Sequence, residues 1–301
     1  MTEPTAHPAG TAPGTAGPAA APPVVVSTPE ELSALRPSLG RIALVPTMGA
    51  LHSGHRRLIA AARADADSVI VSIFVNPLQF GPGEDYQRYP RDLDADVAAC
   101  AAEGVDVVFA PTVEVMYPGE QLVSVDPGPM GQVLEGEFRP GFFAGVLTVV
   151  AKLFHLVRPD TALFGQKDAQ QLAVIRRMVR DLAFGITVLS IPTVRDPDGL
   201  ATSSRNAYLS AEERTSALAL SRALLAGADA SVTGPIGILT AARAVLAEAE
   251  AATPPVAVDY LALVDPGTFG EVTGEYRGEA VLAVAARVGA TRLIDNVPLT
   301  L

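Results

Sequence analysis

The sequence contains a single cysteine, Cys100, and no long apolar segment that we identify as a membrane span. One cysteine excludes a disulfide within the chain and excludes zinc sites built from several cysteines. Because Cys100 lies in an alanine-rich helical stretch, we expect it to be a small buried residue. The longest apolar segment that we find, residues 142–157, carries Lys152 and His155 and is too short to cross a bilayer.

Basic residues are also scarce, with 22 Lys and Arg against 33 Asp and Glu and a net charge of −11. Nucleic-acid binding needs clustered basic side chains, so no nucleic-acid partner is predicted. A small phosphate ligand remains compatible with this charge, because it needs only a local basic pocket. Residues 1–23 lack the basic and apolar regions of a secretory signal. We therefore expect a disordered tail there and a cytoplasmic protein that contacts no membrane.

Short apolar strands alternate with amphipathic helices over the first two thirds of the chain. The predicted strands cover residues 42–45, 68–75, 105–109, 161–164 and 186–191, and the predicted helices cover 56–66, 93–103, 145–157 and 168–182. An earlier helix starts with Thr28 as N-cap, Pro29 at its first position and Glu31 completing a capping box. This alternation predicts an α/β domain over residues 24–193, a Rossmann-like doubly wound parallel sheet with ligands at the strand carboxyl ends.

The pattern changes near Val194. Ser210 and Glu213 open a long Ala/Leu helix, and a second helix covers about residues 236–250. Two strands at 257–264 and 280–286, with a third at 291–296, complete a smaller C-terminal α+β domain over residues 194–301.

Residues 45–55 read Val-Pro-Thr-Met-Gly-Ala-Leu-His-Ser-Gly-His and join a buried strand to a helix through a glycine-containing turn. Unpaired backbone N–H groups at such a turn predict an anion site. His52 and His55 are three residues apart, so both fall on one face of the first helical turn. Two imidazoles beside a phosphate site are typical of nucleotide chemistry.

Two further strand ends carry polar side chains. Asn76 and Gln79 suit a carboxylate or hydroxyl of a small substrate, although Asn-Pro is also a common turn opener. Lys167 is placed to reach phosphate oxygens, and Gln171 lies one turn along the helix that follows. Asp168 either hydrogen-bonds a ribose hydroxyl or simply caps that helix.

Residues 198–206 form a glycine-containing loop with Ser203 and Ser204 next to Arg205. Two hydroxyls and a guanidinium favour a phosphate clamp, and the alternative is a solvated linker. In both cases we expect this loop to be exposed.

In this order and spacing, the four segments resemble the HIGH-box nucleotidyltransferase superfamily and, within it, the pantothenate synthetase family (pantoate–β-alanine ligases). The resemblance runs from about residue 24 to residue 301. Its other motifs are Tyr89-Pro90-Arg91, Phe143 to Val150, Pro192 to Arg195, and Thr291-Arg292-Leu293-Ile294-Asp295-Asn296.

The resemblance implies that ATP, with Mg²⁺ held by its phosphates rather than by protein ligands, activates pantoate as an adenylate that β-alanine then attacks. It implies a homodimer. Its implied catalytic residues are His52, His55, Lys167, Ser203, Ser204 and Arg205. The implied ATP-binding set is Met48, His55, Gly165, Lys167, Asp168, Val194, Ser203, Ser204 and Arg205, and the pantoate-binding set is Met48, Asn76, Gln79 and Gln171.

The sequence departs from the family pattern near these residues. Phe142 stands where histidine is usual, Gln166 where glutamate is usual, Ala169 where an aromatic residue is usual, Ser53 where glutamate is common, and Thr202 where methionine is usual. An amide ligase or adenylating enzyme with altered acid or amine specificity is therefore an alternative, because a fold does not fix its substrate. A regulatory protein that only binds nucleotide is a weaker alternative, because Gln79 and Gln171 are both present.

Overall fold

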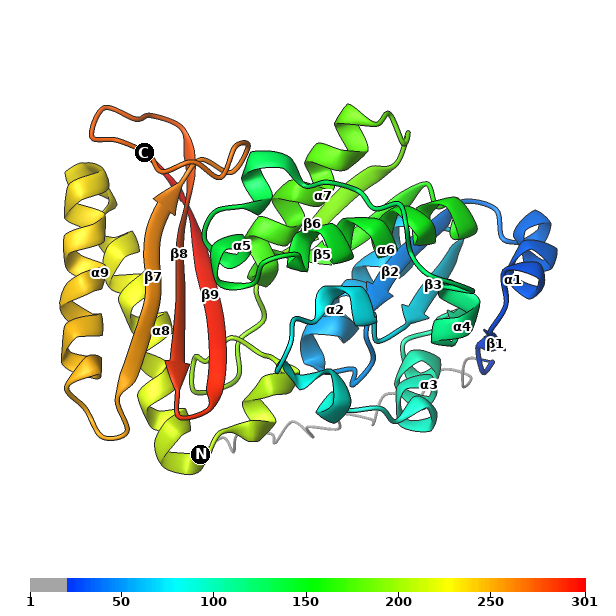
Figure 1. Cartoon of the computed structure of the whole chain (residues 1–301), viewed down its shortest axis with the longest axis horizontal. Coiled ribbons are helices and arrows are strands. Elements are labelled where there is room, and N and C mark those ends of the chain that lie inside the picture. Colours follow the sequence, from blue (N-terminus) through cyan, green and yellow to red (C-terminus); the bar gives the residue numbers. More distant parts are fainter. Residues whose placement is uncertain (1–20) are drawn as a thin grey trace, which may run out of the picture.

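The computed structural model describes residues 21–301 and contains two β-sheets that lie side by side (Figure 1). All but the last three residues of the predicted tail, 1–23, lie outside the described residues. The larger sheet has six parallel strands in the order β1-β4-β3-β2-β5-β6. They are β1 (Val24–Val26), β2 (Ile42–Thr47), β3 (Ser68–Ile73), β4 (Val107–Phe109), β5 (Thr161–Gly165) and β6 (Thr187–Ile191). The predicted doubly wound parallel sheet is confirmed, with β1 as a strand that the sequence reading missed.

Helices cover both faces of this sheet because successive strand residues point to opposite sides. Ile42 and Leu44 face one core, whereas Ala43 and Val45 face the other. The first core is covered by α1 (Pro29–Leu35), α4 (Val113–Met116), α6 (Phe142–Val157) and α7 (Ala169–Asp181), and the second by α2 (Ser53–Asp65) and α3 (Leu93–Ala102). Cys100 is fully buried in the second core, as predicted.

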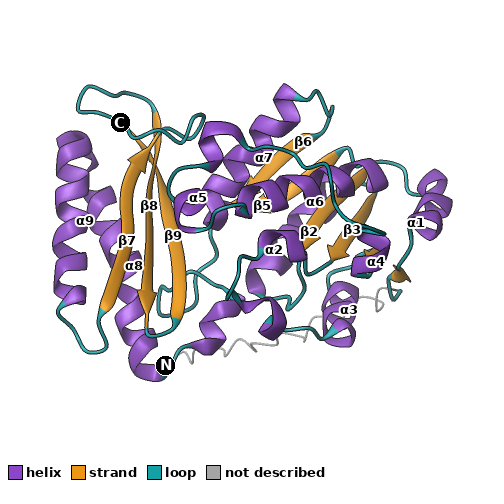
Figure 2. Ribbon diagram, in the orientation of Figure 1, coloured by secondary structure: helices purple, strands orange, loops and turns teal. Residues whose placement is uncertain are grey.

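The smaller sheet is antiparallel in the order β7-β8-β9, with α8 and α9 on one face (Figure 2). Its elements are α8 (Ala211–Asp229), α9 (Gly234–Glu250), β7 (Val256–Val264), β8 (Glu279–Val288) and β9 (Thr291–Thr300). Ala169 and Ala173 of α7 form an apolar cluster with Val264, Val281 and Ala283 of the small sheet. This cluster fixes the small sheet against the large one.

One helical stretch, Ser231–Glu250, is long and apolar enough to cross a membrane by length and composition, although the sequence predicts no membrane span. Its buried residues include Ile238, Ala242, Leu246 and Ala249, which follow one another at helical spacing. They pack into the core beneath the small sheet. This stripe is that of an amphipathic core helix.

Candidate functional site

The strand order of the large sheet reverses between β2 and β5, and a cleft of about 720 Å³ lies at their carboxyl ends. Both sheets contribute to its walls. All of the residues predicted for catalysis and binding line it: Met48, His52, His55, Asn76, Gln79, Gly165, Lys167, Asp168, Gln171, Val194, Ser203, Ser204 and Arg205. The structure therefore brings the four sequence segments to one place.

The backbone amides of the turn after β2 donate hydrogen bonds to other groups of the protein. The buried carboxylate of Asp96, on α3, accepts hydrogen bonds from the amides of Ala50 (3.0 Å) and Leu51 (2.7 Å). The amide of Gly49 donates to the Thr47 hydroxyl at 3.1 Å. An internal carboxylate and a hydroxyl therefore occupy the amides of Gly49, Ala50 and Leu51, and the predicted anion site remains a prediction for the N-terminus of α2.

The two histidines are fixed by the same turn. His52 is the N-cap of α2, which begins three residues before its predicted start. The Nδ1 atom of His52 accepts from the Gly54 amide at 3.2 Å, and Nδ1 of His55 accepts from the His52 amide at 3.3 Å. A nitrogen that accepts carries no proton, so each neutral ring carries its proton on Nε2.

Both imidazoles are uncharged at neutral pH. Burial lowers the pKa of His55 to about 3, and the nearby His52 and Lys167 act in the same direction. Burial also lowers the pKa of His52, with Lys167 contributing. The rings lie close together, with centroids 4.1 Å apart. The site thus presents two neutral N–H donors rather than two cations or two bases.

The side-chain amide of Asn76, which follows β3, makes its hydrogen bonds to other groups of the protein. Asn76 is 1% exposed, and its Nδ2 donates to Gln79 Oε1 and to the Gly145 carbonyl, both at 3.1 Å. Its Oδ1 accepts from the Tyr117 hydroxyl at 2.8 Å and from the Leu78 amide at 3.3 Å. These bonds favour the turn alternative for Asn76 and make it a support for Gln79.

Gln79 is the amide that remains available to a ligand. Its Nε2 lies 3.0 Å from the sulfur of Met48, a weak acceptor that a substrate oxygen can replace. Gly145 of α6 packs so closely beneath this turn that any side chain there would overlap the Leu78 carbonyl. Position 145 therefore has room only for glycine while the turn stays where it is.

The turn after β5 carries Lys167 and Asp168. The Lys167 ammonium lies 3.8 Å from the Asp168 carboxylate, and both side chains line the cleft. Asp168 stands at the N-cap position of α7 but makes no capping hydrogen bond through its side chain. The plain N-cap alternative is therefore not supported, and the carboxylate is available to the cleft.

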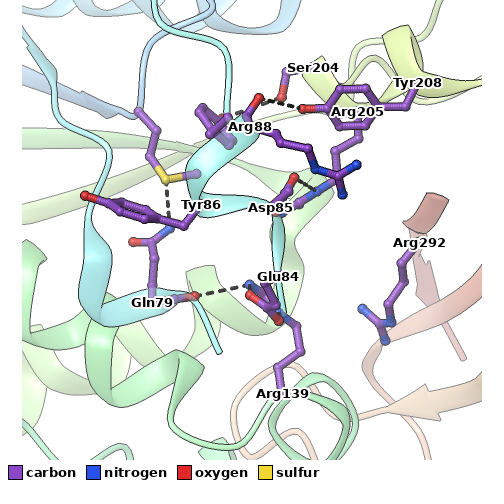
Figure 3. A network of polar contacts seen from close by, with 12 residues as sticks. Gln79, Glu84, Asp85, Tyr86, Arg88, Arg139, Ser204, Arg205, Tyr208 and Arg292 are labelled. Carbon is purple, nitrogen blue, oxygen red and sulfur yellow. Dashed lines mark hydrogen bonds and ion pairs between the residues drawn. The ribbon is translucent and has the colours of Figure 1, made fainter. Parts of the chain in front are cut away.

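The loop after β6 is less exposed than predicted. Leu200 and Ala201 are buried, and Arg205 is 32% exposed, with its guanidinium paired to both oxygens of Asp85 at 3.1 and 3.0 Å (Figure 3). Ser204 Oγ lies 3.5 Å from the Tyr89 hydroxyl. The prediction of an exposed loop is wrong, because these contacts join it to residues 85–89 across the cleft mouth.

Three of the departures from the family pattern have identifiable surroundings. The Arg139 guanidinium lies 3.7 Å from the centre of the Phe142 ring and pairs with both oxygens of Glu84 at 2.7 Å (Figure 3). Ala169 is buried in the cluster that joins the two sheets. The Thr202 hydroxyl donates to Asp196 at 2.6 Å.

Sequence reasoning missed the carboxylates that hold the site. Asp96 follows Asp92 and Asp94 in an acidic helix, which is typical of a solvated face. Its one distinguishing signal is its four-residue spacing from Cys100, which places the two on one helix face. Glu84 and Asp85 lie in a glycine- and proline-rich loop that gives no such signal. Among residues 21–301, no cluster of three His, Cys, Asp or Glu side chains is placed to hold a metal ion.

Comparisons with known proteins cover nearly the whole chain. A family model described as pantoate-beta-alanine ligase matches residues 24–298. The chain is 74% identical to a pantothenate synthetase of Thermobifida fusca, over 93% of this chain and 96% of that protein. A pantothenate synthetase structure from Thermus thermophilus superposes with a TM-score of 0.85 at 50% identity, covering 91% of this chain and 98% of that chain. A pantoate-beta-alanine ligase structure from Francisella tularensis, complexed with beta-gamma ATP and beta-alanine, gives a TM-score of 0.74 at 33% identity, with coverages of 91% and 97%.

Proposed function

Because this chain belongs to the pantoate–β-alanine ligase family, we propose that it joins pantoate to β-alanine with ATP and releases AMP and pyrophosphate. The observation that carries the proposal is that every residue expected for ATP and pantoate lies together in one cleft at the strand reversal. The Francisella tularensis relative, whose structure contains a form of ATP and β-alanine, supports the same substrates.

The proposed first step is attack of the pantoate carboxylate on the α-phosphate of ATP. An oxygen–phosphorus bond forms, pyrophosphate leaves, and a pantoyl adenylate results. No side chain needs to act as a nucleophile, so catalysis rests on positioning and on stabilising the developing phosphate charge. We assign that stabilisation to the Nε2–H groups of His52 and His55, to Lys167, and to the Ser203, Ser204 and Arg205 loop.

In the proposed second step, the amine of β-alanine attacks the pantoyl carbonyl and AMP leaves. We assign pantoate binding to Gln79 and Gln171, with Met48 on the apolar side and Asn76 orienting Gln79. Gly165, Asp168 and Val194 are assigned to the nucleoside. These residues surround the acyl adenylate on several sides and limit its exposure to water.

Magnesium fits this site as a companion of the ATP phosphates. The described residues offer no group of three protein ligands, so the phosphate oxygens would supply most of the coordination. When bound, the ion would neutralise phosphate charge. The protein's own cationic contribution is made by Lys167 and Arg205.

We also propose that residues 24–193 form the ATP- and pantoate-binding domain and that residues 194–301 form a lid, closing mainly through the loop 199–205. Closure would exclude water from the adenylate. A homodimer and a cytoplasmic location complete the proposal. The half-buried edge strand β6 supports the homodimer.

The test is AMP release by the purified protein, measured with and without β-alanine, together with ATP–pyrophosphate exchange dependent on pantoate. We expect exchange with D-pantoate alone and AMP turnover only when β-alanine is added. A panel of other acids and amines tests the alternative of altered specificity. Exchange with a different acid and none with D-pantoate would reject the proposed substrate while leaving the adenylation chemistry intact.

A further inference from the structure

The last strand carries a polar motif to which the proposed function assigns no role. In β9, Arg292, Asp295 and Asn296 each reach across to a segment outside the small sheet. We propose that Asn296 is a positioning residue for the first chemical step, and that it acts by fixing the peptide that presents Lys167 to the ATP phosphates. This inference rests on the proposed function of the same cleft.

The carboxamide of Asn296 is bonded entirely to the turn after β5. Its Nδ2 donates to the carbonyl oxygen of Gln166 at 2.9 Å and to that of Lys167 at 2.8 Å. Its Oδ1 lies 3.4 Å from Nε2 of Gln166. The residue is 3% exposed, so these bonds are largely shielded from solvent. Both N–H groups and the oxygen of the Asn296 carboxamide therefore face two consecutive residues, Gln166 and Lys167.

The position of Lys167 gives these bonds their importance. The sequence has two lysines, and only Lys167 lines the cleft; the Lys152 ammonium lies over the Tyr117 ring. A lysine side chain has many rotamers and makes no bidentate contact, so its aim depends on the backbone that carries it. The Asn296 bonds fix the two peptide groups that flank the Lys167 Cα.

The neighbouring residue ties the same strand to the other phosphate loop. Asp295, also buried, accepts from both terminal nitrogens of Arg195 at 2.6 and 3.1 Å, and Arg195 donates to the Gly199 carbonyl at 3.2 Å. Strand β9 therefore touches both segments that carry cationic candidates. The Asn296 contact is the one that acts on Lys167 directly.

The experiment is a double-mutant cycle on the rate of ATP–pyrophosphate exchange. Asn296→Asp keeps the shape of the side chain but sets a carboxylate against two carbonyl oxygens. We expect it to slow exchange by about 10- to 100-fold, by analogy with the loss of a group that orients a metal-binding side chain. In a Lys167→Ala background the same change should cost almost nothing further, because the group on which it acts is gone. Asn296→Ser, which keeps one donor, should show a smaller loss and provides the cycle if the aspartate variant folds poorly.

Arg292→Lys is the matched control. Arg292 also links β9 to the large part of the chain, through two 2.7 Å bonds to Glu135, but it makes no bond to the Lys167 turn. We expect both single variants to lower the unfolding temperature and only the Asn296 variants to lose exchange in a Lys167-dependent way. If an Asn296 variant lowers the exchange rate by the same factor with Lys167 present and in the Lys167→Ala background, Asn296 has only a structural role and the proposal is overturned. That result is distinguishable from failure of the proposed function, which would already appear as absent exchange in the unmodified protein.

Discussion

Two walls of the cleft are built in opposite ways. The turn after β2 is held by the buried Asp96 carboxylate and by its own imidazoles, all within the large part of the chain. The loop after β6 is held by ion pairs between distant segments, such as Arg205 with Asp85, whose side chains are 32% and 13% exposed. Buried bonds to backbone amides are costly to break, whereas partly exposed ion pairs contribute little net stability. The first wall is therefore preformed, whereas the Arg205–Asp85 pair of the second wall can change partners.

Removing a donor from the preformed wall should have the largest effect. We expect His55→Ala to lower the rate of adenylate formation by about 10²–10³-fold, equivalent to roughly 2.7–4 kcal/mol, as for loss of one oxyanion-hole donor. Because His55 also accepts the His52 amide, unfolding should become easier by about 1 kcal/mol.

His55→Asn separates these two effects. Asparagine keeps a short acceptor for the His52 amide and lacks the Nε2–H that we assign to phosphate. Stability in urea should recover and pre-steady-state adenylate formation should stay slow. Near-normal adenylate formation in either variant would contradict the role of His55.

The second largest effect is expected from replacing Asp96, whose carboxylate holds the turn after β2. Asp96→Asn replaces one of two accepting oxygens with an amino group that faces a backbone N–H. We expect a loss of about 1.5–3 kcal/mol in the free energy of unfolding, measured by urea denaturation, and a slower first step because His52 follows this turn. Asp94→Asn, exposed on the same helix, is the control and should change stability by less than about 0.5 kcal/mol. A silent Asp96→Asn would remove the basis for calling this wall preformed.

The third prediction concerns pH. The pKa of folded His55 is about 3, so below pH 6.5 the unfolded chain binds a proton that the folded chain excludes. Stability should therefore fall as pH drops from 6.5 toward 3, by about 2 kcal/mol at pH 5 from this residue. Urea midpoints at pH 7 and pH 5 measure the effect, and the decrease should be smaller in His55→Asn. An equal decrease in both proteins would mean that His55 is charged in the fold.

The smallest effect is expected for Arg205, in the loop after β6. Arg205→Lys should slow adenylate formation about tenfold, or ~1.4 kcal/mol, because lysine cannot reproduce a bidentate contact. Its effect on stability should stay below about 1 kcal/mol, since the pair with Asp85 is partly exposed. Stopped-flow measurement of the first step and thermal unfolding provide the two numbers.

Asp85→Asn sharpens this last prediction. Burial alone would raise the pKa of Asp85, but the hydrogen bonds and charge of Arg205 outweigh it and hold that pKa below its usual value. Removing the charge should leave stability nearly unchanged and alter KM for ATP more than KM for the acid. Equal changes in both constants would place Arg205 away from the phosphates.

Much of the fold could be predicted from the sequence because its main elements are decided locally. Strands such as β2 and β5 are apolar runs, and α1 and α8 start with capping boxes that the structure retains. The three-residue strand β1 was missed because only its pairing with β4 makes it a strand. The start of α2 was placed late because an imidazole is an unusual N-cap.

The residues that line the cleft could be predicted from the sequence, but the hydrogen bonds and ion pairs that hold them could not. The motif residues identify which groups converge, because parallel strands end at one edge of the sheet. The motif at Asn76 does not reveal that its amide is already saturated by Gly145 and Tyr117. The partners of Arg205, Lys167 and Ala50 come from residues 46 to 129 positions away, and no local pattern encodes them.

The close approach of Gly145 to the Leu78 carbonyl limits how this enzyme can be redesigned. Enlarging or reshaping the acid pocket from the side of α6 would require moving the 76–79 turn, and Gln79 with it. Phe142, at the first position of α6, also borders the cleft, and its ring lies against the Arg139 guanidinium rather than against this turn. A library aimed at new acids or amines should therefore vary position 142 and keep position 145 as glycine.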